Sequence, residues 1–323
     1  MSAPTPDVDD SDWHSAYHAP VLAREVIGLL AGYETVLDGT LGGGGHSLAL
    51  LQAGVKQVIG IDRDPDALDA ARARLASYVT NGRFRAYLGN FADIDAIHEL
   101  AGLRFAGILL DLGISSHQVD DPKRGFTFRA DAPLDMRMDG GAGGGITAAE
   151  LLDTFDEHAL ASIFREYGDE RRAHRLAREV VRRRGNRSFV VSDDFVGAIR
   201  GALGPRSGPA DFARLFQSLR IAVNDELRSL EQALPVLRDR LEAGGTLAII
   251  AYHSGEDRLV KHAFREWSSD CICPPKQPAC TCRGRALGTL VSRKATTPSP
   301  DELARNPRAR SAHLRAFRRA DAT

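Results

Sequence analysis

The stretch Thr35-Val-Leu-Asp-Gly-Thr-Leu-Gly-Gly-Gly-Gly-His-Ser47 joins a short apolar strand to a glycine-rich turn and the start of a helix. Backbone N–H groups at a helix N-terminus bind anions and nucleotides, and glycine lets the backbone approach a ligand closely. A second apolar segment, residues 57–61, ends in Asp62, where a carboxylate can accept hydrogen bonds from both hydroxyls of a ribose. The stretch therefore predicts a strand–loop–helix site for a nucleotide.

The segments around this loop alternate between strand and helix. Apolar residues at helical spacing predict a helix between residues 20 and 32, with further helices beginning near Ser47 and Pro65. Strands are expected over residues 35–38, 57–61, 83–88 and 106–110, and the last of them ends at Asp111. Such alternation is typical of a parallel, doubly wound sheet, so the predicted fold class is α/β.

The alternation stops after Ser116. The glycine-rich run 140–145 is expected to be a flexible connection, and Thr147-Ala-Ala-Glu150 matches a helix capping box. Strand candidates are scarce from there until Thr246. We therefore expect a disordered leader at residues 1–17, a sheet domain formed by residues 18–119 and 214–323, and a helical insertion at residues 120–213 that recognises the substrate.

Three further elements are expected to complete the sheet domain. A long helix from about Ala213 to Leu241 would bring the chain back to a strand over residues 246–252. Residues 285–292 and 311–317 are expected to add a closing antiparallel pair.

Composition excludes several classes of protein. The chain has 323 residues, a length that can bury a full core. Of these residues 43% are hydrophobic and 26% are charged, a composition that argues against overall disorder. No apolar run approaches the roughly 18 residues of a membrane-spanning helix, and the acidic N-terminus lacks a signal-peptide pattern. We therefore expect a cytosolic protein without a membrane partner.

Charge is unevenly distributed along the chain. The net charge is −1, so no overall field marks a nucleic-acid binder. Residues 165–187, however, contain nine arginines and four acids, and residues 303–323 contain six arginines and one acid. Arginine suits phosphate contacts, so these segments are candidates for binding phosphate groups; the alternative is a solvated helix face for the first and a frayed basic tail for the second.

All four cysteines lie in two short motifs, Cys271-Ile-Cys273 and Cys280-Thr-Cys282. Four thiolates can bind zinc tetrahedrally, although each motif has one residue between its cysteines where zinc ligands usually have two to four. A reducing cytosol disfavours disulfides. Structural zinc and reduced, unliganded cysteines both remain open, and no metal ligand is assigned to the nucleotide site.

The acid at the entrance of the glycine loop distinguishes between two cofactors. Asp38 would repel a pyrophosphate, and Gly42 and Gly44 are followed by Ser47 where the dinucleotide fingerprint has a third glycine or alanine. A ligand with an ammonium and a sulfonium group would instead be attracted. The chemistry thus favours S-adenosylmethionine over a nicotinamide cofactor, and an oxidoreductase is the disfavoured alternative.

Several distinctive segments follow one another in an order that matches one family. They are His18-Ala-Pro-Val-Leu22, Asp38–Ser47, Gly60-Ile-Asp-Arg-Asp-Pro65, Leu110-Asp-Leu-Gly-Ile-Ser-Ser116, Arg124-Gly-Phe-Thr-Phe128, Pro133-Leu-Asp-Met-Arg-Met-Asp139, Phe216–Leu227, Tyr252-His-Ser-Gly-Glu-Asp-Arg258 and Asn306-Pro-Arg-Ala-Arg-Ser311. In these segments the chain resembles the bacterial RsmH (MraW) 16S rRNA cytosine-N4 methyltransferases, over roughly residues 18–317.

The resemblance implies a class I S-adenosylmethionine-dependent methyltransferase with a Rossmann-like doubly wound sheet and an inserted helical domain. Its implied substrate is the N4 amine of a cytidine, cytidine 1402 in the family, in the decoding region of 16S rRNA within the small ribosomal subunit. The cofactor residues that it implies are Gly44, Gly45, His46, Asp62, Phe91, Asp111 and Gln118. A non-catalytic ribosome-assembly factor is a third hypothesis, which the intact loop and Asp62 disfavour.

The exocyclic amine of cytosine is a poor nucleophile, so acceptors for its N–H groups would assist methyl transfer. Related enzymes supply them from an Asp/Asn-Pro-Pro-aromatic turn, whose place is taken here by residues 111–116. Asp111 and His253, each at the end of a strand, are the catalytic candidates. The alternatives are a cofactor-orienting role for Asp111 and a structural hydrogen bond for His253.

The target base must leave its stack to reach the methyl group. Two phenylalanines and three nearby arginines are candidates for holding it: Phe126, Phe128, Arg124, Arg129 and Arg137. The alternative is that the phenylalanines only tie the insertion to the sheet.

Overall fold

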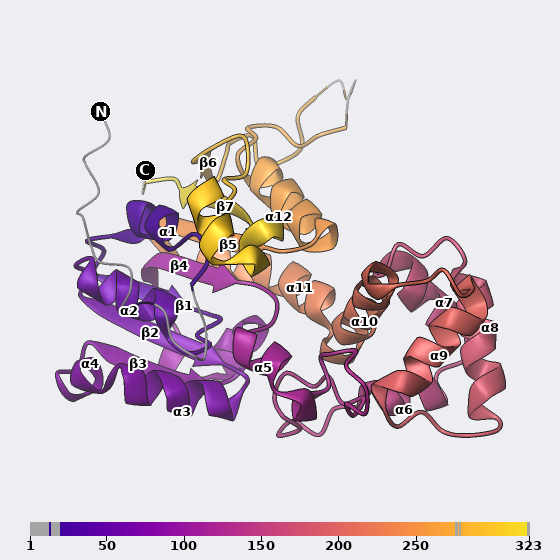
Figure 1. Ribbon diagram of the computed structural model, residues 1–323. Helices are drawn as coiled ribbons and strands as arrows, with labels where there is room; N and C mark the ends of the chain where they lie inside the picture. Colours follow the sequence, from indigo (N-terminus) through magenta and orange to yellow (C-terminus); the bar gives the residue numbers. More distant parts are fainter. Residues whose placement is uncertain (1–12, 14–19, 275–276, 278, 322–323) are drawn as a thin grey trace. The chain divides into compact units, whose positions relative to one another are not determined.

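The computed structural model describes residue 13 and residues 20–274, 277 and 279–321 (Figure 1). Over these residues the chain forms two compact units. We call the described residues up to Gly113 and from Ser229 onward the sheet unit, and residues Ile114–Arg228 the helical unit. Most of the predicted leader lies outside the described residues.

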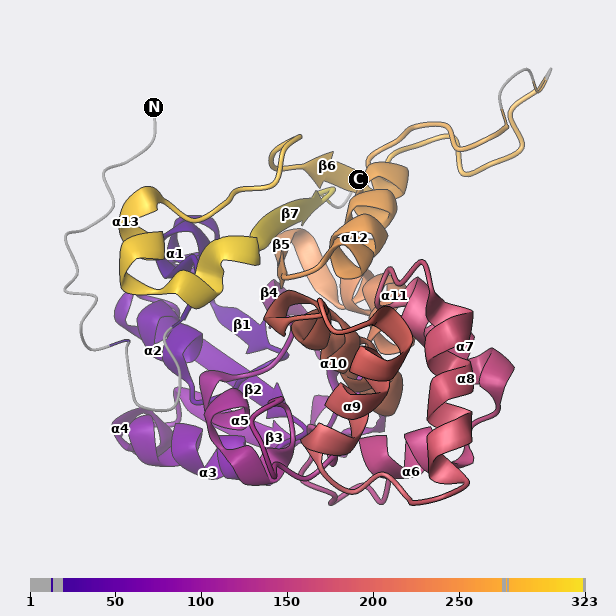
Figure 2. The same ribbon diagram turned by 45° about the vertical axis from the view of Figure 1, so that its right-hand side comes forward.

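The sheet unit is built on a seven-stranded sheet with the order β3-β2-β1-β4-β5-β7-β6 (Figure 2). Its strands are β1 (Thr35–Asp38), β2 (Gln57–Asp62), β3 (Phe84–Leu88), β4 (Phe105–Asp111), β5 (Leu241–Ala251), β6 (Gly288–Leu290) and β7 (His313–Arg319). Strands β1 to β5 are parallel, whereas β7 is antiparallel to both β5 and β6. The predicted doubly wound fold and its closing antiparallel pair are confirmed.

Helices cover the sheet on both faces. They are α1 (Ala23–Leu30), α2 (Gly45–Gln52) and α3 (Pro65–Arg74) on one face and α11 (Glu226–Asp239) and α12 (Ser254–Trp267) on the other, with α4 (Ala76–Thr80) and α13 (Pro300–Arg305) at the periphery. Successive strand residues point to opposite faces, so Leu109 of β4 packs in one core while Ile108 and Leu110 pack in the other. Burial on both faces explains why the strands read as continuous apolar runs.

The strand order changes direction between β1 and β4, which are hydrogen-bonded neighbours although β2 and β3 separate them in sequence. Open α/β sheets bind ligands at the carboxyl ends of the strands at such a switch point. The glycine loop after β1 and Asp111 at the end of β4 both lie there.

The helical unit contains α5 (Ser116–Asp120), α6 (Ala148–Thr154), α7 (Glu157–Glu166), α8 (Ala173–Arg184), α9 (Ser192–Leu203) and α10 (Pro209–Asn224). The capping box expected at Thr147 is present at the start of α6. The unit is wider than the predicted insertion at 120–213, because the apolar face of α10 packs into its core. Phe212, Leu215 and Phe216 of that face are buried there.

The single long helix predicted from Ala213 to Leu241 is wrong, because the chain forms α10 and α11 with a break at Asp225. This residue adopts a left-handed conformation with φ 50°, which an α-helix does not accommodate. Asn224 beside it donates to the carbonyl of Met136 (2.7 Å) and accepts from the N–H of Met138 (2.8 Å). The side chain of Asn224 therefore fastens the 136–138 loop to the end of α10.

Within the predicted leader, residues 1–17, the structure describes Trp13. Its ring is buried against Ala23, Ile27 and Ala49, and its indole N–H donates to Gln52 Oε1 (2.7 Å). At this residue the prediction of a disordered leader is wrong.

Among the described helices, none has both the length and the apolar character that crossing a bilayer requires.

Candidate active site

The glycine loop connects β1 to α2 at the switch point of the sheet. Gly42 and Gly44 have φ values of 51° and 74°, which favour glycine. A Cβ atom on Gly44 would also lie 3.1 Å from Leu75 Cδ1 and 3.3 Å from Ala71 Cβ, so the loop rests directly on the α3 segment. Gly45 opens α2, whose first backbone N–H groups have no acceptor within the helix.

Asp62 at the end of β2 is tied to this loop. Its Oδ2 accepts from the N–H of Gly42 (2.7 Å) and its Oδ1 accepts from the N–H of Asp64 (2.9 Å). Burial raises the pKa of Asp62 to about 6, against these two hydrogen bonds, which lower it. The carboxylate is therefore positioned by the backbone on both sides, and it is an anion at neutral pH.

Asp38 at the end of β1 is buried and accepts a hydrogen bond from the hydroxyl of Ser47 (2.7 Å). Burial raises its pKa above the ordinary value. Ser47 occupies the place of the third small residue in a dinucleotide fingerprint, and its hydroxyl supports the acid instead. Sequence reasoning noted this serine only as a departure from the fingerprint and missed its partner.

Asp111 at the end of β4 is held by three neighbours. Its backbone N–H donates to Thr40 Oγ1 (2.6 Å), and its Oδ1 accepts from the hydroxyl of Tyr252 (2.8 Å). Its Oδ2 lies 3.6 Å from Nδ1 of His46. Burial, followed by the charge of Asp111, raises the pKa of Tyr252 well above its usual range, so the phenol remains a donor.

His46 is buried and contacts the carbonyl of Val21 through Nε2 (2.9 Å). A carbonyl only accepts, so Nε2 carries the proton and Nδ1 faces Asp111. The side chain thus connects the segment before α1 to the acid at the end of β4. Thr40 and Tyr252, which complete this group, were missed because their partners are distant in sequence.

His253 does not reach this group of side chains in any contact of the described residues. It caps α12, because its Nδ1 accepts from the N–H of Gly255 (3.2 Å). Glu256 accepts from the N–H groups of Tyr252 (2.8 Å) and His253 (3.3 Å). This geometry matches the structural alternative for His253, and its catalytic role stays a prediction.

The other two predicted residues lie differently. Phe91 begins the 3₁₀ segment after β3 and is half-buried, and its Cβ lies 3.2 Å from the Cβ position of Gly39 at the start of the glycine loop. Gln118 belongs to the helical unit, where its amide caps α5 and donates to the carbonyl of Met138 (3.2 Å). The sheet unit thus brings together Gly44, Gly45, His46, Asp62, Phe91 and Asp111, and a cofactor contact of Gln118 stays a prediction.

This arrangement has a definite chemical preference. Acids end three adjacent strands, β2, β1 and β4, around a glycine loop and a helix N-terminus. A positively charged group on a nucleoside would be attracted to such a site, whereas a pyrophosphate beside buried Asp38 would be repelled.

Comparison with known proteins identifies the family. Residues 15–320 match the MraW methylase family. The chain belongs to this family. The methylase is 60% identical over 304 residues to ribosomal RNA small subunit methyltransferase H of Gemmatimonas aurantiaca, covering 94% of this chain and 96% of that protein. The namesake from Heliobacterium modesticaldum is 45% identical over 309 residues, covering 93% and 97%.

A solved structure, that of the putative methyltransferase SMU.1697c from Streptococcus mutans with SAH, matches at 12% identity and a TM-score of 0.41 over 92% of this chain and 94% of that one. The fold assignment rests instead on the strand order of the methylase. Its cofactor is S-adenosylmethionine, which supplies a methyl group activated on a sulfonium when bound. The residues present fit such a group, since the acids that end β2, β1 and β4 lie around the glycine loop and make the surrounding charge negative.

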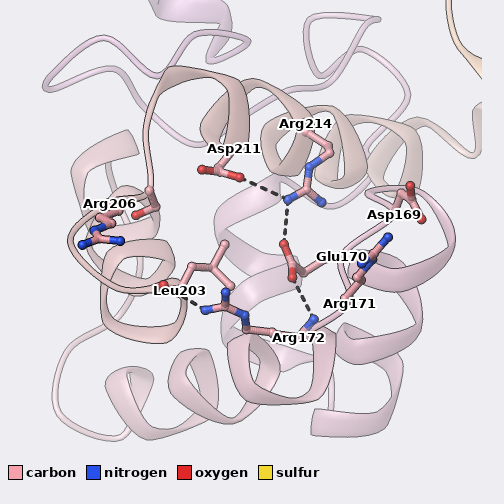
Figure 3. A pocket seen from close by; sticks show the side chains of 9 residues that line it. Asp169, Glu170, Arg171, Arg172, Leu203, Arg206, Asp211 and Arg214 are labelled. Carbon is pink, nitrogen blue, oxygen red and sulfur yellow. Dashed lines mark hydrogen bonds and ion pairs between the residues drawn. The ribbon is translucent and has the colours of Figure 1, made fainter.

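The helical unit of the methylase carries a pocket of about 410 Å³ lined by Asp169, Glu170, Arg171, Arg172, Leu203, Arg206, Ser207, Asp211 and Arg214 (Figure 3). Arg214 lies between Glu170 (2.6 Å) and Asp211 (3.4 Å), and Arg172 donates to the carbonyl of Leu203 (3.0 Å). Much of the positive charge of this pocket is therefore neutralised within the unit.

The arginines of α8 are engaged to different degrees. Arg184 donates to the carbonyls of Leu152 and Phe155 and so fastens the end of α6, a structural role. Arg182 and Arg183 both pair with Glu179, whose pKa they lower to about 2. The predicted basic surface is thus less positive than its sequence count indicates.

Proposed function

We propose that this methylase transfers a methyl group to the N4 amine of a cytidine in the decoding region of 16S rRNA, the position that the resemblance gives as cytidine 1402. Its relatives in Gemmatimonas aurantiaca and Heliobacterium modesticaldum carry the name ribosomal RNA small subunit methyltransferase H. The observation that carries the proposal is the anchored carboxylate of Asp111. We also propose that the enzyme acts within the small ribosomal subunit and is therefore cytoplasmic.

In this proposal the residues of the glycine loop and β2 hold the cofactor. Asp62 accepts from the ribose hydroxyls, and the backbone of Gly44, Gly45 and His46 faces the amino-acid part of the ligand. Phe91 packs beside the adenine. Charge-assisted hydrogen bonds to a carboxylate are about twice as strong as neutral ones, so Asp62 contributes most to affinity among these residues.

Asp111 acts on the amine. The lone pair of the cytosine amine is delocalised into the ring, and an acceptor for its N–H makes the pyramidal, nucleophilic form more favourable. Positive charge grows on the nitrogen during the transfer, and a carboxylate fixed beforehand stabilises it without reorganisation. In this proposal the Asp111 carboxylate, which the hydroxyl of Tyr252 holds at Oδ1 (2.8 Å), accepts from the amine and takes up the proton that the methylated amine releases.

Part of the predicted base-holding group suits this role. The ring of Phe128 is 38% exposed and leans on Phe212 and Phe216, with ring centroids 5.9 Å and 6.0 Å apart. An exposed aromatic face supported from behind is a suitable platform for stacking an unpaired base. Phe128 and the exposed Arg129 are therefore the residues that we assign to the flipped base.

The rest of that group supports the helical unit. Phe126 packs against the core of the unit. Arg124 is buried and donates to the carbonyl of Met138 (2.7 Å), and Arg137 forms a two-point pair with Asp135 (2.9 and 2.7 Å). These contacts fix the loop that presents Phe128, so we assign no RNA contact to the two arginines.

The test compares two substrates in a methyl-transfer assay with labelled S-adenosylmethionine. Small subunits from cells that lack this methylation should accept label, whereas subunits already carrying it should not. An Asp111→Asn variant should retain cofactor affinity and lose most of its turnover. Loss of affinity with unchanged turnover would instead assign Asp111 to orienting the cofactor.

A further inference from the structure

The segment between α12 and β6 projects away from the sheet and returns to it (Figures 1 and 2). Its base is fastened at three points. The N–H of Leu287 donates to the carbonyl of Trp267 (2.7 Å), that of Ala286 donates to Asp270 Oδ1 (3.2 Å), and Arg283 pairs with Glu266 (2.8 Å). Beyond this base, the described residues of the segment are exposed or half-exposed, so no hydrophobic core holds its two runs together.

The four cysteines lie on these two runs and converge. Cys271 and Cys273 are on the outgoing run, and Cys280 and Cys282 are on the returning one. Sγ of Cys280 lies 3.8 Å from that of Cys271, 3.8 Å from that of Cys273 and 3.4 Å from that of Cys282. Sγ of Cys282 lies 3.9 Å from that of Cys271, and all four atoms are within 4.8 Å of one another.

These spacings match a tetrahedron around one ion. Zinc–sulfur bonds of about 2.3 Å in tetrahedral geometry place the sulfur atoms about 3.8 Å apart. A disulfide would need two sulfur atoms at about 2.05 Å, and no pair here approaches that distance. A cluster of several irons would need the sulfur atoms to surround a larger body.

The backbone of the segment is arranged around the same sulfur atoms. The N–H of Ile272, inside the first motif, donates to Sγ of Cys282 (3.4 Å). The N–H of Thr281, inside the second motif, donates to Sγ of Cys273 (3.4 Å). Each motif thus donates to a sulfur atom of the other, and an N–H donor favours the thiolate form that a metal requires.

Ordinary packing does not account for the convergence. Unliganded cysteine is among the most buried residue types, yet Cys271 and Cys280 are exposed and the other two are only half-buried. The nearby side chain of Ile272 is 44% exposed, so no apolar core gathers the thiols.

We propose that Cys271, Cys273, Cys280 and Cys282 bind one structural zinc ion that cross-links the projecting segment between α12 and β6. Thiolates are soft ligands, and a tetrahedral set of four selects zinc or iron. All four positions of the ion are filled by protein, so the site is structural and leaves no position open for a substrate. The ion replaces the hydrophobic core that the segment lacks.

The test measures metal content of the full chain, purified with a reductant and without chelators or a metal-affinity tag. Inductively coupled plasma mass spectrometry should find about one zinc ion per chain. The Cys280→Ser and Cys271→Ser variants should lose most of it, by about tenfold or more. The control Ile272→Val lies between two cysteines, keeps every sulfur and should retain its zinc.

Thiol titration of the wild-type protein keeps the test independent of any variant that misfolds. The four cysteines should react slowly with a thiol reagent and rapidly after treatment with a strong chelator, and added zinc should restore the protection. Zinc far below one equivalent after incubation with zinc chloride would overturn the proposal. Iron in place of zinc, or four cysteines paired as disulfides under reducing conditions, would also overturn it.

Discussion

Replacing Asp62 by asparagine tests the geometry of the cofactor site in detail. Both carboxylate oxygens already accept from backbone N–H groups, Oδ2 from Gly42 and Oδ1 from Asp64. Asparagine has one oxygen, so its amide nitrogen must face one of these two donors and a hydrogen bond is lost. A charge-assisted bond to the ribose is lost with it. Such bonds contribute about 1.5–3 kcal/mol, which predicts cofactor affinity weaker by roughly 10- to 150-fold.

Isothermal titration calorimetry with S-adenosylmethionine measures this change. The matched control is Asp69→Asn, which removes the same charge from the outer surface of α3, where the Asp69 side chain is 82% exposed. The control should bind like the wild type. An Asp62→Asn protein with wild-type affinity would refute the assignment of Asp62 to the ribose.

The raised pKa of Asp62 adds a pH dependence to the same experiment. Below about pH 6 the free protein protonates Asp62, so cofactor affinity should weaken as pH falls, approaching about tenfold per pH unit. Folding stability changes in the opposite direction, because a folded pKa above the unfolded value stabilises the fold as pH falls from about 6 toward 3.8. In the Asp62→Asn variant, neither the fall in cofactor affinity nor the gain in folding stability that protonation of Asp62 causes should occur. If the variant and the wild type showed the same pH profile of affinity, Asp62 would not be the group that titrates.

Three further predictions concern turnover, capping and RNA binding. Tyr252→Phe removes the donor to Asp111 and should lower kcat about tenfold or more while leaving cofactor affinity in calorimetry unchanged; an unaltered kcat would separate the phenol from the chemistry. His253→Asn, which preserves a capping acceptor, should keep wild-type kcat, whereas His253→Ala should lose about 1 kcal/mol of unfolding free energy in denaturant titrations; loss of turnover in the asparagine variant would make His253 catalytic. Changing Arg171 and Arg175, which are exposed just before and on α8, to glutamine should raise KM for RNA and flatten its salt dependence; identical salt slopes in methylation kinetics would mean that this surface does not contact RNA.

The sheet and the main acids of the site could be predicted because their signals are local. Each strand is a short apolar run, and Asp62 and Asp111 come directly at the ends of two of them. Parallel strands place these ends on one edge, so the acids had to lie near the glycine loop. The closing pair β6 and β7 could be anticipated for the same reason.

Other features depend on contacts between distant residues and could not be predicted. Tyr252 reaches Asp111 across 141 positions of sequence, and its phenol has no local signal. The amphipathic pattern of α10 shows that one face is buried but not which core buries it. Asp225 is one of two adjacent acids after a regular helical pattern, so its left-handed backbone was not expected.

The arginines illustrate the same limit for charge. The sequence gives nine of them between residues 165 and 187, and their number favours a phosphate-binding surface. Arg184 instead holds backbone carbonyls, and Arg182 and Arg183 share Glu179. Charge counts therefore predict which segments can bind phosphate. The contacts of each arginine with acids and carbonyls of the fold decide which arginines remain available to bind it.

The most direct measurement of the central claim is the identity of the modified nucleoside. Small subunits lacking the modification are incubated with the purified protein and S-adenosylmethionine, and their 16S rRNA is digested and analysed by mass spectrometry against synthetic methylcytidine standards. We expect N4-methylcytidine at a single cytidine of the decoding region, and no N4-methylcytidine with the Asp111→Asn variant. A methyl group on a ring carbon, on a ribose hydroxyl or on another base would contradict the proposed N4 methylation of cytidine.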